Sequence, residues 1–193
     1  MKKLSVKQRL IALSATALLG ALVMGSSIAY FTAKDTARNV ITTGSVAIKL
    51  HETMINEDGE TVPFEDAIGV MPGDQVSKIV EVENTGGQDA WIRVSVEKEI
   101  QLAEGVSGEP DTSLVTFDLD EEDWTEQDGY YYYNKKLSAG EKTEPLFTQV
   151  SFAKEMGNLY QDSKAIVNVE AYATQVANNG DTVFEAAGWP DAQ

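Results

Sequence analysis

The stretch WIRVSVEKEI at residues 91–100 sets the structural period of this chain. Ile92, Val94 and Val96 occupy every second position, and Ile100 continues the same series, while the positions between them are polar or charged. Successive side chains of a β-strand point to opposite faces. The alternation therefore predicts a strand with one dry and one wet face.

The same pattern recurs along the chain. Apolar residues on one face mark five further candidate strands: Val46, Ile48 and Leu50; Val80 and Val82; Val115, Phe117 and Leu119; Leu146, Val150 and Phe152; and Val167, Val169, Ala171 and Ala173. Turn sequences lie between them, at residues 71–74 (MPGD), 84–87 (NTGG), 128–129 (DG) and 139–141 (AGE). Alternating strands separated by short turns of this kind are typical of antiparallel sheets.

About seven such strands, with little helical periodicity, predict an all-β fold, namely a jelly-roll or Greek-key β-sandwich over residues 44–193. We expect long polar loops around residues 52–70 and 103–113, with short helices in them. Residues 181–189 are expected to form about two helical turns that stop at Gly188. An N-terminal signal helix is expected before the domain.

The composition excludes several classes of function. The chain has 193 residues, of which 31 are acidic and 15 basic, giving a formal net charge of −16. Such a surface repels the phosphate backbone of nucleic acids, so no nucleic-acid partner is expected. The absence of cysteine excludes disulfides, thiol nucleophiles and thiolate metal sites. The single histidine excludes any site that needs two.

Residues 1–29 have the pattern of a secretory signal peptide. An uncharged stretch, Leu10–Met24, follows a basic start that contains no acidic residue. Ser27 and Ala29 form a small-x-small cleavage site, which predicts a mature chain that begins at Tyr30. We expect a secreted protein of the extracellular matrix or cell surface, which meets the membrane only before cleavage.

Cleavage would leave 11 basic against 31 acidic residues, a net charge of −20, because the four basic residues lost are Lys2, Lys3, Lys7 and Arg9. The alternative is a retained membrane anchor, since the uncharged stretch continues to Ala33.

The candidate metal sites are weak. His51-Glu52 matches the start of the H-E-x-x-H zinc motif, but Ile55 stands where the second histidine belongs, so a histidine at the end of a strand is favoured. A second group of carboxylates departs from the spacing of a calcium-binding EF-hand loop and is interpreted as a solvated acidic loop. Its weak candidates are Asp118, Asp120, Glu122 and Asp123. No cofactor is expected.

Tyr130–Tyr133 is a run of four tyrosines. On a strand, two of them lie on each face. We expect two to fill the core and two to cover the sheet, while contact with a sugar or a partner is the other interpretation.

Several blocks of the chain together resemble the TasA/camelysin family of exported bacterial proteins. They are AYFT at residues 29–32, TGSVAI at 43–48, the turn, strand and corner at 71–86, and VEAYATQ at 169–175. The ending AAGW at 186–189 is most similar to the clostridial biofilm-matrix branch.

The resemblance implies processing by a SipW-type signal peptidase and a jelly-roll domain that polymerises into extracellular biofilm-matrix fibres. The candidate donor strand is residues 30–43, with Tyr30, Phe31, Val40 and Ile41 as its assembly residues. It would be donated to a neighbouring subunit, either another copy or a related matrix protein. The open alternative is that this segment pairs within its own subunit.

Two other functions stay open. Camelysin-type relatives are labelled zinc metalloproteases, and here His51, Glu52 and distant carboxylates would have to hold the metal. Because no zinc-protease pattern is present, we predict that the chain is not an enzyme. The third possibility is a monomeric surface module that binds a sugar or a host protein through Tyr130–Tyr133.

Overall fold

The computed structural model describes residues 46–190 and the backbone of residues 31–42. The predicted signal peptide at residues 1–29, with Ser27 and Ala29, and Tyr30 after it lie outside the described residues. Within the described ranges, no helix is both long and apolar enough to cross a membrane.

The described chain is almost entirely β-structure, as the alternating pattern predicts. Two short 3-10 helices, η1 and η2, interrupt twelve strands. In chain order the elements are β1 (Phe31–Thr42), β2 (Ile48–Ile55), β3 (Thr61–Pro63), β4 (Ala67–Val70), β5 (Gln75–Ser77), β6 (Ile79–Asn84), β7 (Ala90–Gln101), η1 (Thr112–Leu114), β8 (Val115–Phe117), β9 (Trp124–Gln127), β10 (Tyr130–Tyr133), β11 (Gln149–Phe152), η2 (Asn158–Tyr160) and β12 (Ser163–Gln175).

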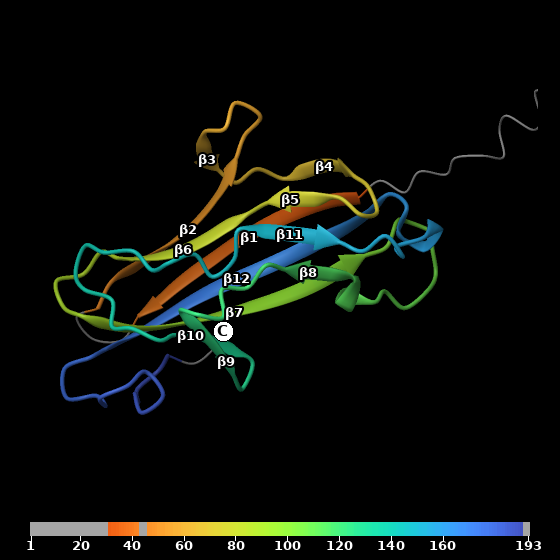
Figure 1. The fold of residues 1–193 in the computed structure, drawn as a ribbon. Helices are drawn as coiled ribbons and strands as arrows, with labels where there is room; N and C mark the ends of the chain where they lie inside the picture. Colours follow the sequence, from red (N-terminus) through yellow and green to blue (C-terminus); the bar gives the residue numbers. More distant parts are fainter. Residues whose placement is uncertain (1–30, 43–45, 191–193) are drawn as a thin grey trace, which may run out of the picture.

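One layer of the fold is a six-stranded sheet in the order β4-β1-β12-β7-β10-β9. Its two central strands, β12 and β7, pair antiparallel without interruption from Lys164 opposite Gln101 to Gln175 opposite Ala90. Figure 1 shows β1, β12 and β7 as long strands that run side by side. This pair is the longest continuous ladder among the described strands.

The other layer combines two three-stranded sheets, β5-β11-β8 and β3-β2-β6. Backbone hydrogen bonds join them, because the N–H of Val80 donates to the carbonyl of Phe147 and the N–H of Leu146 donates to the carbonyl of Val80. The segment before β11 therefore continues the pairing along β6. The two small sheets act as one covering layer for the six-stranded sheet.

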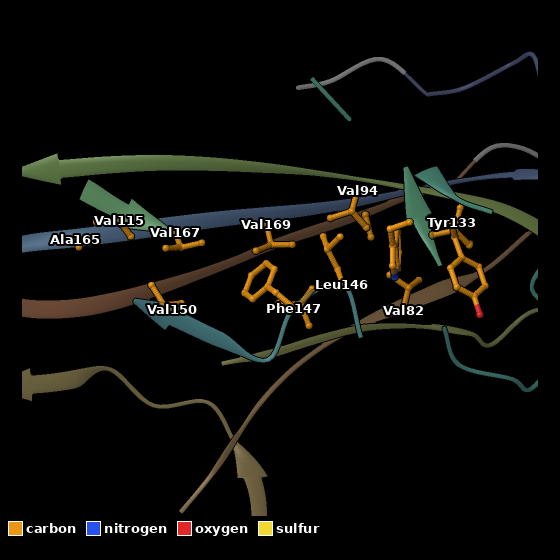
Figure 2. Close-up of a cluster of buried hydrophobic side chains, with 14 of the residues drawn as sticks. Val82, Val94, Val115, Tyr133, Leu146, Phe147, Val150, Ala165, Val167 and Val169 are labelled. Atoms are coloured by element: carbon orange, nitrogen blue, oxygen red, sulfur yellow. The ribbon is translucent and has the colours of Figure 1, made fainter. Parts of the chain in front are cut away.

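The hydrophobic core lies between these layers. Figure 2 shows Val167 and Val169 of β12 with Leu146, Phe147 and Val150 in one cluster. The residues of this cluster that β7 and β12 supply come from every second position, as the alternation of WIRVSVEKEI predicts. This dry interface fixes which face of each central strand points inward.

A buried ion pair lies at the break between β5 and β6. Nζ of Lys78 is 2.6 Å from Oε1 of Glu52, and the two side chains are 2% and 4% exposed. The ammonium group also lies 4.1 Å from the centre of the Phe64 ring. Charges are tolerated at this depth only when they are paired and hydrogen-bonded.

The predicted turn chemistry is confirmed at two positions. At residues 71–74 the N–H of Asp74 donates to the carbonyl of Met71, and Gly73 has a φ of 89°. That backbone conformation is one that glycine adopts without strain. Asp128 and Gly129 both have positive φ, which suits the tight hairpin between β9 and β10.

Two expectations for the irregular regions are wrong. Residues 181–189 form bends and a single turn instead of two helical turns. Val183 is buried in a cluster with Trp91 and Tyr132, and Asn179 holds the backbone of Ala187. These tertiary contacts override the local helical tendency.

Residues 52–70 are not one long loop with helices. They hold the end of β2 and the strands β3 and β4. The carboxamide of Asn56 accepts hydrogen bonds from the N–H groups of Asp58 and Glu60, and so closes the β2–β3 hairpin. In the 103–113 region, by contrast, a short helix begins, since η1 starts at Thr112.

Phe147 provides a test of the core. Its side chain is 1% exposed and stacks on Phe117 with ring centroids 4.6 Å apart. Phe147→Ala should lower the free energy of unfolding by about 3–5 kcal/mol, because it removes buried contacts and leaves a cavity. Urea denaturation measures this. The control Val106→Ala changes a side chain that is 40% exposed and should stay within about 0.5 kcal/mol. Equal effects of the two substitutions would contradict the core assignment.

Candidate functional site

Residues 31–42 of the candidate donor strand form β1, which lies inside the six-stranded sheet. Its backbone pairs parallel with β12 on one side and antiparallel with β4 on the other. Figure 1 shows β1 in orange beside β12 in blue. Within the described chain, the segment therefore pairs in its own subunit, which is the alternative left open by the sequence.

The register places each predicted assembly residue of β1. Phe31 lies opposite Ser163 of β12 and Val70 of β4, Val40 opposite Ala171 and Ile41 opposite Tyr172. Tyr30 lies outside the described residues. The pairing with β12 shifts between Ala37 and Val40, where β1 carries one extra residue. Such a bulge bends the strand and increases its local twist.

β12 depends on this neighbour. Its inward side chains are buried, among them Val167 and Val169 at 5% and 0% exposure. Without β1, the backbone N–H and C=O groups along one edge of β12 would have no strand to pair with. That open edge would lie beside the buried apolar side chains of β12. An open, apolar edge of that length is a template for pairing with another chain.

His51 and Glu52 have separate partners. Nε2 of His51 lies 2.6 Å from Oε2 of Glu83 on the neighbouring strand β6. Glu52 pairs with the buried Lys78 instead. Consecutive residues of a strand point to opposite faces, so this geometry does not bring the imidazole and the Glu52 carboxylate to one metal ion.

Three of the acidic candidates, Asp118, Asp120 and Asp123, have hydrogen-bond or ion-pair partners close by, and the fourth, Glu122, is exposed. Asp118 accepts hydrogen bonds from the N–H groups of Thr148 and Gln149, and Asp120 accepts from those of Glu122 and Asp123.

Asp123 pairs with Lys135 at 2.6 Å, and this hydrogen bond raises the pKa of the Lys135 ammonium. Among the described residues, no group of three His, Asp or Glu side chains is placed to hold a metal ion. Asp118 thus joins the segment before β9 to the start of β11, while Asp120 bonds within its own turn.

The four tyrosines of β10 divide between the two faces of the sheet, as expected. Tyr131 and Tyr133 pack with the main core, whereas Tyr130 and Tyr132 belong to a second apolar cluster on the outer face. All four are at least partly buried. They therefore do not form one exposed aromatic platform.

The outer face is organised by Arg93 of β7. Its guanidinium carbon lies 3.9 Å from the ring centre of Tyr130, 5.2 Å from that of Tyr172 and 4.8 Å from that of Trp189. Its Nη2 also donates to the carbonyl of Pro190 at 3.2 Å. A planar cation among aromatic rings gains both cation–π and packing energy.

The C-terminal segment, residues 176–190, folds back over this face. The Nδ2 of Asn179 donates to Thr174, Gln175 and Ala187, and its Oδ1 accepts from the N–H of Ala187. The indole of Trp91 donates to the Asn179 carbonyl. Asn179 thus fastens the segment to β12 and β7.

The contacts of Arg93 and Asn179 could not be predicted from local sequence patterns. Arg93 occupies a polar position of WIRVSVEKEI and looks like a solvated side chain, and Asn179 looks like a loop residue. Their roles depend on residues far along the chain. The excess of aromatic residues at residues 130–133, 172 and 189 was the one available hint of a second cluster.

No protein-family model, no curated protein and no solved structure matches this chain at a significant level.

Tyr172 gives this outer face a measurable pH dependence. Burial and the hydrogen bond from its hydroxyl to Glu170 raise the pKa of Tyr172 to about 12 from its usual 10.0. The unfolded phenol ionises near 10, so the stability present below that pH should be lost as the pH rises toward 12. Urea denaturation across this range, with tyrosinate absorbance of the folded protein, measures both effects.

The variant Tyr172→Phe should weaken this alkaline loss. Burial also raises the pKa of Tyr131 and Tyr133, so the loss should lessen without vanishing. An unchanged alkaline profile in Tyr172→Phe would contradict the assignment to Tyr172.

Proposed function

We propose that this chain is an exported structural protein that assembles into, or decorates, extracellular biofilm-matrix fibres by strand donation between subunits. In this proposal the β-sandwich is a jelly roll of the TasA/camelysin type. A SipW-type peptidase would release it at Tyr30, and residues 30–43 would then link it to copies of itself or to related matrix subunits.

The position of β1 is the observation that carries the proposal. β1 is the first described strand, yet it lies between β12 and β4 inside the sheet. Only its C-terminal end continues to another strand of the described fold, through residues 43–47 to β2. After cleavage at Tyr30, β1 could leave the sheet without unthreading any other strand.

Exchange of β1 between subunits would preserve its pairing with β12 and β4. The same segment from a second subunit can make the β1–β12 and β1–β4 ladders in the same register, as in domain swapping. Main-chain hydrogen bonds complete the open edge in this mode of recognition. Each subunit would accept one strand and donate its own, so the contact is head-to-tail and does not close.

The first test compares a chain that begins at Tyr30 with one that begins at Gly44. Size-exclusion chromatography with light scattering and negative-stain microscopy should show filaments from the longer chain only, because the shorter one lacks the donor strand. Monomers from both would remove self-assembly as a property of this chain.

Engineered cysteines then test the register, which is possible because the natural chain contains none. Thr32 lies opposite Lys164, at the spacing of neighbouring strands, about 4.8 Å. Thr32→Cys on one chain and Lys164→Cys on another should form a disulfide between subunits in assembled material.

The matched control uses Asn168→Cys in place of Lys164→Cys. It lies four residues further along β12, about 13 Å away, too far for a disulfide. Filaments that give no Thr32–Lys164 link, or that link equally through residue 168, would contradict strand donation in this register.

Charge should control assembly. A subunit of net charge −20 repels its copies, and salt or lower pH weakens that repulsion. Light scattering of the chain from Tyr30 should therefore rise with added salt, and as the pH falls toward its isoelectric point, which lies below the value near 4.3 of the whole sequence because four basic residues are lost. Scattering that declines steadily over the same pH range would argue against charge-limited assembly.

A further inference from the structure

A pocket of about 250 Å³ lies beside β9, the edge strand of the six-stranded sheet. It is lined by Leu119, Asp120, Glu121, Trp124, Thr125, Glu126, Tyr131 and Leu146. Sites for drug-sized ligands occupy about 300–1,000 Å³, so this one suits a single side chain.

The lining divides into an apolar part and an acidic part. Trp124 and Leu146 are buried core residues, and Leu119 and Tyr131 pack against that core. Thr125 and three acidic residues, Asp120, Glu121 and Glu126, complete the lining, and none of the lining residues is basic.

The acidic groups are available to a ligand. The carboxylates of Glu121 and Glu126 belong to exposed residues and make no ion pair within the described ranges. Glu126 lies opposite Tyr131 in the hairpin, and its charge adds to the effect of burial in raising the pKa of the Tyr131 phenol. A ligand with an apolar stem and a positive head fits both parts of such a lining.

The walls of the pocket are fixed by the turn at residues 118–123. The N–H of Asp120 donates to the carbonyl of Leu146, and Oδ1 of Asp120 accepts from two N–H groups of the turn. The Trp124 indole donates to the carbonyl of Glu144. Asp120 and Trp124 are therefore held in place before any ligand arrives.

The adjacent edge offers backbone groups as well. The N–H of Trp124 points away from β10, because it donates to the carbonyl of Asp120. Hydrogen-bonding direction alternates along an antiparallel strand, so Glu126, two residues on, also directs its N–H and C=O outward. An extended peptide can pair there while one of its side chains enters the pocket.

We propose that this pocket binds a lysine side chain presented by an extended peptide segment of a partner protein. The alkyl stem packs on Leu119, Trp124 and Leu146, and the ammonium group lies between the carboxylates of Glu121 and Glu126. The peptide backbone pairs with Glu126 at the β9 edge. This contact is separate from the strand donation proposed above, and its test is run at low salt and neutral pH, where repulsion between the acidic subunits opposes assembly.

The test titrates the chain that begins at Tyr30 with a blocked pentapeptide, Thr-Val-Lys-Val-Thr, and follows amide NMR shifts and Trp fluorescence. A matched peptide carries norleucine in place of lysine. The lysine peptide should shift the signals of residues 119–126 and bind at least about fivefold more tightly than the norleucine peptide. Glu121→Gln and Glu126→Gln should each weaken its binding by about two- to fivefold.

Glu122→Gln is the control, since Glu122 is an exposed acid next to the pocket but not part of its lining. It should leave the affinity unchanged, with all variants checked for folding by circular dichroism. Equal binding of the norleucine peptide, equal weakening by Glu122→Gln, or no shift at residues 119–126 would overturn the proposal. Equally tight binding of free 1,4-diaminobutane would overturn the peptide as the source of the ammonium group.

Discussion

The rest of the structure depends on the antiparallel pairing of β7 with β12. These are the two central strands of the large sheet, and their ladder runs without a bulge from one end to the other. Because strand side chains alternate, one register fixes both faces at once. A slip of one residue would turn Val94 and Val169 toward the outside and bring Arg93 and Glu170 into the core. The apolar series on both strands makes every such slip unfavourable.

The same register explains why the outer face needs its own cover. The inward side chains of these strands fill the core, and β7, β10 and β12 carry Arg93, Tyr130 and Tyr172 on the opposite face of the sheet. Residues 176–190 close over them, with Val183 buried and Asn179 saturated by hydrogen bonds. This second cluster is smaller than the main core and includes a permanent charge, so it relies on the geometry of stacking more than on buried area. The sheet is thereby covered on both faces over part of its length.

Alternation and turn chemistry were enough to predict the β class, the inward residues of β7 and β12, and the division of the four tyrosines between two faces. These features depend on local periodicity, which a sequence displays directly. The errors concern segments whose structure is set by distant partners. Residues 181–189 have a local helical tendency but are held by Asn179 and Trp91, and the hairpin after Ile55 is closed by the side chain of Asn56. The buried pair of Lys78 and Glu52 could not be predicted either, since both residues are ordinarily solvated and only the fold brings them together.

The contacts of β1 do not by themselves decide between a monomer and a fibre. The β1–β12 ladder is the same set of hydrogen bonds whether one chain or two supply it, so its energy largely cancels in the exchange. A short connection such as residues 43–47 gives a strand an effective concentration on the order of millimolar for its own sheet, which favours pairing within the chain at low protein concentration. Linkage between subunits must overcome that advantage and the repulsion of strongly acidic copies. The balance is therefore governed by the local concentration of subunits and by the ionic conditions.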